Sequence, residues 1–142
     1  MEAKTFFTFA QKLAQMRDEP ALRSAVSRAY YYAAYHFSIG LVREIGFPFE
    51  KGAQAHEKIY QYLRSTQIQD AVSAANDLKL LRKRRNEADY ELESNEFKDH
   101  VSCQIDLARA HLILSQIEKL SREPLRSQLA GGLREYHAKI HS

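Results

Sequence analysis

The sequence predicts an all-α protein: an up-and-down bundle of four to five helices followed by a short C-terminal helix. Apolar side chains recur at steps of three and four along most of the chain, which is the period of a helix with one buried face. Five glycines and three prolines are too few for an all-β protein, which needs a turn every ~8–12 residues. With 142 residues, of which 44% are hydrophobic, the chain suits one compact domain with its own core.

Pro20 separates the first two predicted helices, because the residue before a proline disfavours helical geometry. The first covers residues 4–18. The second is long and covers residues 21–43, and its middle is rich in aromatic side chains: Tyr30, Tyr31, Tyr32, Tyr35 and Phe37. Tyr30 lies on the apolar stripe and is expected in the core. Tyr31, Tyr32 and Tyr35 are interpreted either as a dimer interface, where tyrosine is favoured, or as a platform on which nucleobases stack.

A glycine-flanked loop over residues 46–52 is expected next, followed by a short helix over 54–65 and two longer helices over 70–92 and 97–120. The expected buried stripe of the first long helix consists of Ala74, Leu78, Leu81, Arg85, Ala88 and Leu92. The wide apolar face of the second consists of Val101, Ile105, Ala108, Leu112, Ile113 and Ile117. Gly131 and Gly132 are expected to split a weakly attached tail. We therefore divide the chain into a bundle, residues 1–121, and a helical tail, residues 122–142.

Composition limits the classes of function. The chain has 21 Lys and Arg against 18 Asp and Glu, so its net charge of +3 does not by itself indicate nucleic-acid binding. No apolar run approaches the ~20 residues of a membrane span, and no secretory signal is visible, so we expect a cytoplasmic protein without membrane contact. The single cysteine, Cys103, excludes an internal disulfide and is interpreted as a buried hydrophobe rather than a nucleophile. No metal site and no cofactor is expected.

The densest charge cluster contains five cations within seven residues: Lys79, Arg82, Lys83, Arg84 and Arg85. One interpretation is structural: Arg85 with Asp89 and Lys83 with Glu87 form ion pairs one helical turn apart, worth about 0.2–0.5 kcal/mol each. The other is a basic ridge that binds phosphates. Several acidic residues follow at once and shorten the reach of such a ridge in physiological salt.

Arg85 stands out within this cluster. At 100° per residue it falls on the same stripe as Leu78 and Leu81. A guanidinium on an apolar stripe is costly unless it is paired, or unless the stripe lines an interface or cleft. Asp89 lies one turn further on, so the helix is expected to present Arg85, Asn86, Asp89 and Tyr90 as a polar group at the edge of its core-facing surface.

Two segments carry a resemblance to a known family. Residues 23–36 read RSAVSRAYYYAAYH and residues 81–90 read LRKRRNEADY, with His56 between them. Over roughly residues 20–120 the chain resembles the HEPN superfamily, in particular its small stand-alone branch. The resemblance implies a helical bundle and a homodimer whose two motif helices face each other. Many members are metal-independent endoribonucleases of toxin–antitoxin or defence systems, and some accompany a minimal nucleotidyltransferase.

The resemblance also assigns candidate site residues. Arg85 matches the arginine of the R-x4-6-H motif and Asn86 matches the polar position after it, but Asp89 and Tyr90 occupy the region where the histidine is found. Cleavage through the RNA 2′-hydroxyl needs a group that exchanges protons near pH 7, which suits histidine and not aspartate or tyrosine. The candidate catalytic residues are Arg85, Asn86, Asp89 and Tyr90, and the candidate nucleic-acid-binding residues are Arg28, Arg82, Lys83, Arg84 and Arg85.

Other side chains complete the expected site. Arg28 and Ser24 are expected to be the polar partners of the motif helix, and Arg23 is a less favoured candidate. His36 and His56 are the histidines that a bundle can bring to the motif helix, although a lone histidine is more often a structural hydrogen-bonding group.

Three functions follow from these observations. The first is a dimer that binds RNA or nucleotide phosphates at its cleft, including a metal-independent endoribonuclease. The second is a catalytically degenerate interaction module that works with an antitoxin or a minimal nucleotidyltransferase. The third is a scaffold without a ligand.

Overall fold

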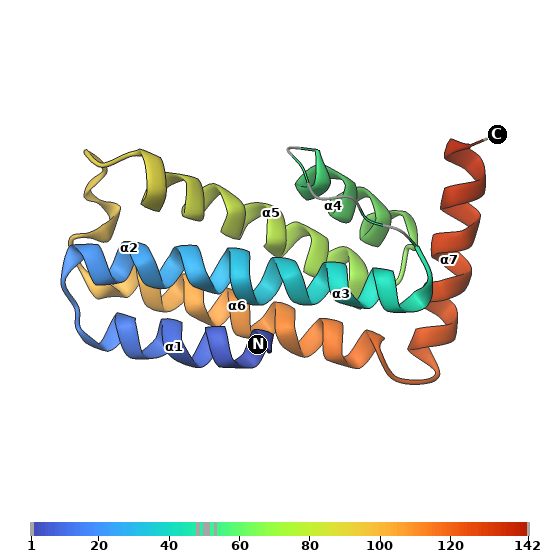
Figure 1. Ribbon diagram of the computed structural model, residues 1–142, viewed down its shortest axis with the longest axis horizontal. Coiled ribbons are helices and arrows are strands. Elements are labelled where there is room, and N and C mark those ends of the chain that lie inside the picture. The colour runs from blue at the N-terminus through green and yellow to red at the C-terminus, as the bar shows by residue number, and fades with distance from the viewer. Residues whose placement is uncertain (1, 48, 50–51, 53, 142) are drawn as a thin grey trace.

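The long helices pack side by side around one apolar core (Figure 1). The computed structural model describes residues 2–47, 49, 52 and 54–141. Its elements are α1 (Ala3–Gln15), α2 (Glu19–Ser27), the π-helix η1 (Arg28–Tyr35), α3 (His36–Ile45), α4 (Ala55–Ser65), α5 (Gln69–Tyr90), the 3-10 turn η2 (Asn95–Phe97), α6 (His100–Leu120) and α7 (Leu125–Ile140). All regular structure among these residues is helical, which confirms the predicted all-α class.

The predicted helices are present with small shifts at their ends. The expected helix over 21–43 is one continuous helical segment formed by α2, η1 and α3. Asp18 caps it, because its carboxylate accepts a hydrogen bond from Ala21 N at 2.9 Å, and Pro20 lies in the first turn. Gly46 ends α3 with a φ of 118°, a left-handed conformation that favours glycine. Part of the expected loop over 46–52 lies outside the described residues.

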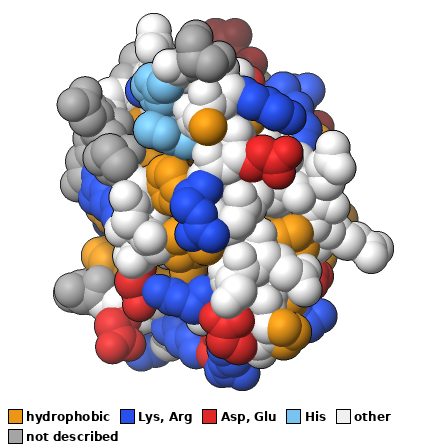
Figure 2. Space-filling model, turned by 90° about the vertical axis from the view of Figure 1, so that its right-hand side faces the viewer, with side chains coloured by type: hydrophobic (Ala, Val, Ile, Leu, Met, Phe, Trp, Pro, Cys, Tyr) orange, Lys and Arg blue, Asp and Glu red, His pale blue; other side chains and the backbone are white. Residues whose placement is uncertain are grey.

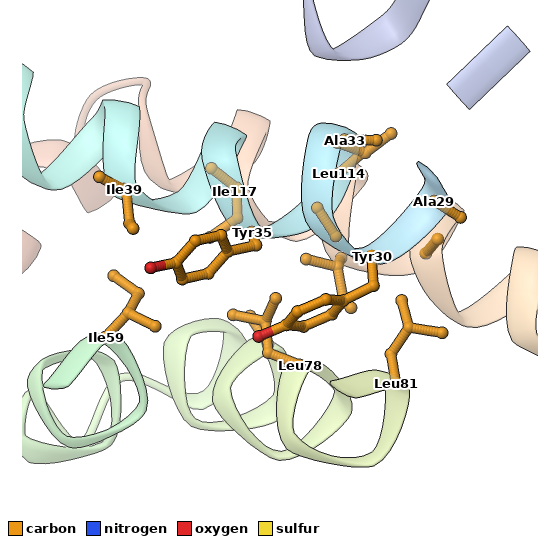
Figure 3. Packing of buried hydrophobic residues seen from close by; sticks show 14 of the residues in the cluster. Ala29, Tyr30, Ala33, Tyr35, Ile39, Ile59, Leu78, Leu81, Leu114 and Ile117 are labelled. Carbon is orange, nitrogen blue, oxygen red and sulfur yellow. The ribbon is translucent and has the colours of Figure 1, made fainter. Parts of the chain in front are cut away.

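The core lies between α2–η1, α5 and α6, with α1 and α4 packed at its sides. Figure 3 shows Tyr30 and Tyr35 of η1 among Leu78 and Leu81 of α5, Ile59 of α4, and Leu114 and Ile117 of α6. The fully buried face of α5 contains Ala74, Leu78 and Leu81, as the sequence predicts. Leu92 was expected on this face but is 73% exposed, because α5 ends at Tyr90 and Leu92 lies beyond the helix.

The apolar face of α6 was predicted only in part. Ile113 and Ile117 are buried as expected, whereas Val101, Ile105 and Leu112 are about half exposed and Ala108 is exposed as well. The reason is that α6 carries two apolar stripes at helical spacing. The stripe that faces the core consists of Cys103, Leu107, Ala110, Leu114 and Ile117, and periodicity alone does not distinguish the two.

The expected split of the tail at Gly131 and Gly132 was wrong: α7 runs through both glycines as one helix. It stands across one end of the bundle (Figure 1) and packs on α4 and α6 through buried Leu129 and Leu133. A Cβ atom added to Gly132 would lie 3.0 Å from Thr66 Cβ, so the glycine permits close contact with the end of α4. The boundary at residue 121 stays a prediction.

None of the helices described is both long enough and apolar enough to cross a lipid bilayer.

Candidate functional site

Arg23 of α2 connects the first motif segment to the C-terminal end of α5 through hydrogen bonds. Its residue is 8% exposed, and its guanidinium donates hydrogen bonds of 3.0–3.3 Å to the backbone oxygens of Glu87, Ala88, Glu91, Leu92 and Ser94. It also pairs with Glu19 at 3.0 Å. The last carbonyls of a helix lack partners within the helix, so a buried cation that binds them closes the end of α5. Arg23 therefore fixes where the motif helix stops.

The cations of α5 do not form one ridge, because the helix directs them to different neighbours. Arg84 faces α6, where its Nε lies 2.9 Å from Oδ2 of the buried Asp106, and its guanidinium carbon lies 4.7 Å from the Phe97 ring centroid. Arg82 and Lys83 line a groove beside α4 together with Lys79. The expected phosphate-binding set is thus divided, and Arg84 is already held by an acidic partner.

Arg85 lies at the junction of α5 and η1. Its Nε is 3.1 Å from Asp89 Oδ2, an ion pair without the alignment of a hydrogen bond, and its Nη1 donates to Asn86 Oδ1 at 3.2 Å. Its guanidinium carbon lies 5.3 Å from the Tyr31 ring centroid. Ser27 donates to Asp89 at 3.1 Å. Arg85, Asn86 and Asp89 therefore do lie together, and 18% of the Arg85 side chain stays accessible.

Two predicted partners lie elsewhere. Tyr90 is 72% exposed at the end of α5. Arg28 was expected against the motif helix, but it donates a hydrogen bond to Ser24 in its own helix and lies over the Phe9 ring of α1 at 5.4 Å. Arg23 and Ser27, which lie five residues and one residue before Arg28, supply the contacts to α5 in its place.

The π-helix η1 arranges the aromatic side chains beside Arg85. A π-helix has a wider turn than an α-helix, so residues five apart come to one face. The Tyr30 and Tyr35 rings stack at 5.7 Å, and Tyr31 O accepts a 2.8 Å hydrogen bond from His36 Nδ1. This geometry buries Tyr35, which the α-helical period had placed on another face than Tyr30.

A chain of short hydrogen bonds brings His56 to this cluster. Tyr30 Oη is 2.8 Å from Tyr60 Oη and 2.6 Å from His56 Nδ1, and the His56 ring stacks on Tyr35 at 4.0 Å. We assign Tyr60 as donor to Tyr30 and Tyr30 as donor to His56 Nδ1, because this order uses both hydroxyl protons. The imidazole then carries its own proton on Nε2.

The surroundings of His56 favour its neutral form. Burial, followed by the positive charges of Arg82, Arg85 and His36, lowers the pKa of His56 to about 4. Burial raises the pKa of the Tyr30 hydroxyl well above its ordinary value, so this group stays protonated. Arg82 Nε is buried here without a hydrogen-bond partner. The site thus combines two guanidinium groups with a neutral imidazole and a hydroxyl.

The role of Tyr60 could not be predicted from the sequence, because nothing in its local pattern separates it from an ordinary core tyrosine. His56 was one of two candidate histidines, and only tertiary packing places it beside Arg82. Cys103 is fully buried, as expected for a hydrophobic core residue. Burial raises the pKa of its thiol to about 11, which disfavours the nucleophilic thiolate.

Charges of both signs are mixed over the end of the molecule that carries α7 (Figure 2), where no continuous basic field is seen. Within the described part of the chain, no three histidine, cysteine or acidic side chains come close enough to hold a metal ion. Comparison of the chain with protein-family models, curated proteins and solved structures gives no match.

Proposed function

We propose that this chain is a HEPN-type homodimer that binds RNA or nucleotide phosphates at the surface around Arg85. The observation that carries the proposal is the Arg85 guanidinium, which Asp89 and Asn86 hold in place while part of it stays accessible. A guanidinium held in this way presents several donors to phosphate oxygens at little further cost in conformational entropy. Arg82, with its unpartnered Nε, adds a second positive charge nearby.

The test is equilibrium binding of a fluorescently labelled single-stranded RNA, followed by anisotropy. Arg85→Ala should weaken RNA binding at least tenfold. Arg85→Lys should weaken it less, because lysine keeps the positive charge but lacks the planar guanidinium group. The matched control is Arg122→Ala, which removes an arginine whose side chain is 73% exposed and paired with Glu118. Unchanged RNA affinity in a folded Arg85→Ala protein would contradict the proposal.

A second candidate function is metal-independent cleavage of RNA at the same surface, and the position of His56 favours it. In the other tautomer, His56 Nδ1 donates to Tyr30 Oη, and the free Nε2 of the neutral imidazole can accept the proton of a 2′-hydroxyl. The 2′-oxygen then bonds to the phosphorus of the neighbouring phosphate, which the arginines bind, and the 5′-oxygen leaves and takes a proton from water. We propose His56 for this role, in place of the histidine that the motif lacks.

Cleavage of labelled RNA in excess EDTA tests this candidate. Activity should disappear in Arg85→Ala and in His56→Gln, while His56→Gln keeps its RNA affinity. If the native protein bound RNA without cleaving it, the proposed cleavage would be contradicted. A binding protein, or a module that works with a partner, would then remain as the proposed function.

A further inference from the structure

The α4–α5 groove adjoins the Arg85 surface and has the size of a small-ligand site. Its volume is about 440 Å³, and its lining includes Glu57, Tyr60, Leu80, Arg82, Asn86 and Glu91. Sites for small organic groups usually range from about 300 to 1,000 Å³. Leu80 is 49% exposed and gives the groove an apolar side chain that a ligand can reach.

The charges around the groove have both signs. Lys79, Arg82 and Lys83 lie on α5, whereas Glu57 enters from α4 and Glu91 from the end of α5. Three cations and two carboxylates leave the groove close to neutral, so its charge gives no strong preference for a phosphate group. A flat, uncharged group with polar edges suits the combination of apolar floor and mixed rim better.

Asn86 connects the groove to Arg85. Its Oδ1 accepts the hydrogen bond from Arg85 Nη1, and the same side chain lines the groove. Because the amide oxygen is engaged, the amide nitrogen remains as a hydrogen-bond donor. A ligand that places a phosphate on Arg85 therefore has its neighbouring group beside Asn86.

We propose that this groove holds one nucleobase of the bound RNA and favours bases with an exocyclic amino group. The proposal rests on the proposed RNA binding at Arg85. Leu80 contacts the face of the base, the carboxylates of Glu57 and Glu91 accept hydrogen bonds from its amino group, and Asn86 donates to a ring nitrogen or carbonyl. Adenine and cytosine carry such an amino group, whereas uracil carries a carbonyl oxygen in its place.

The experiment compares labelled oligoadenylate, oligocytidylate and oligouridylate of one length by fluorescence anisotropy. The native protein should bind the adenylate and cytidylate oligomers about tenfold more tightly than the uridylate oligomer. The double variant Glu57→Gln, Glu91→Gln should reduce this preference to less than threefold. Leu80→Ala should weaken binding of all three, and the control Leu112→Ala, which truncates an equally exposed leucine on α6, should leave binding unchanged.

The outcomes separate the two proposals. If the native protein bound all three oligomers with equal affinity and Arg85→Ala still lost binding, the proposed base site in the groove would be overturned. The proposed RNA binding at Arg85 would still stand. If the folded double variant kept the preference for bases with an amino group, Glu57 and Glu91 would not be its source, and the proposed base site would also be overturned. Absence of binding to every oligomer would overturn both proposals.

Discussion

Arg23 shows how one buried side chain can determine the end of a helix. Its guanidinium holds five backbone oxygens at and beyond the C-terminus of α5, and it lies 4.7 Å from the Phe97 ring centroid. A buried cation with this many acceptors is well compensated, but its removal takes a charged donor from five carbonyl oxygens, of which that of Ala88 is buried.

We expect Arg23→Ala to lower the free energy of unfolding by about 3 kcal/mol, because those carbonyls lose charged donors. Arg23→Lys should recover less than half of the loss, since one ammonium group cannot reach all five oxygens. Urea denaturation followed by circular dichroism measures both changes. The control is Arg122→Ala, and equal stability of the Arg23→Ala and Arg122→Ala proteins would contradict this role.

The second prediction at the residue scale concerns the protonation of His56. Its pKa in the folded protein is about 4, against about 6.5 in an unfolded chain. Between these values the unfolded state binds a proton that the folded state does not, so stability should fall as the pH is lowered from about 6.5 to 4. The full contribution is present above pH 6.5.

Two measurements check this prediction. The His56 ring resonances in an NMR titration should change near pH 4, and His56→Gln should make the unfolding free energy less dependent on pH in that window. A His56 pKa at or above 6.5 would contradict the described environment.

At the scale of the element, η1 marks the limit of what could be predicted from the sequence. The helical period over 21–43 predicts the helix and the burial of Tyr30, because both follow from local apolar spacing. It does not predict the π-helical turn that brings Tyr35 to the same face, where the Tyr35 ring stacks on His56 from a distant segment. The candidate site was predicted in part for the same reason: Arg85, Asn86 and Asp89 are neighbours on one helix, whereas His56 comes from a distant segment.

The two glycines of α7 give a prediction with a built-in control. A Cβ on Gly132 would lie 3.0 Å from Thr66 Cβ and 3.1 Å from Thr66 Cα, whereas a Cβ on Gly131 meets nothing within 4 Å. Gly131→Ala should raise stability by up to about 1 kcal/mol, the difference in helix propensity. Gly132→Ala should lower it by about 1–2 kcal/mol, because the backbone of Thr66 must move. Thermal denaturation compares the two, and equal stabilisation by both would contradict the close contact of α7 with α4.

At the scale of the whole molecule, we propose that two copies of the bundle form a dimer. The fold brings Arg85, Arg82 and His56 to one region from α5 and α4, and the HEPN resemblance proposes that a second copy brings an equivalent set to the same cleft. The single chain has a mass of 16.4 kDa. Light scattering at micromolar protein concentration should give twice that mass. A monomer at all accessible concentrations would contradict the proposed dimer while leaving the single-copy site in place.

The central claim is that Arg85 contacts a phosphate of bound RNA, and the salt dependence of binding tests it most directly. Each phosphate contact to a single strand contributes about −0.7 to the slope of log K against log salt concentration. We expect Arg85→Ala to make the slope less steep by about 0.7 for each Arg85 in the complex, and Arg122→Ala to leave it unchanged. The same slope for the native and Arg85→Ala proteins would contradict the claim.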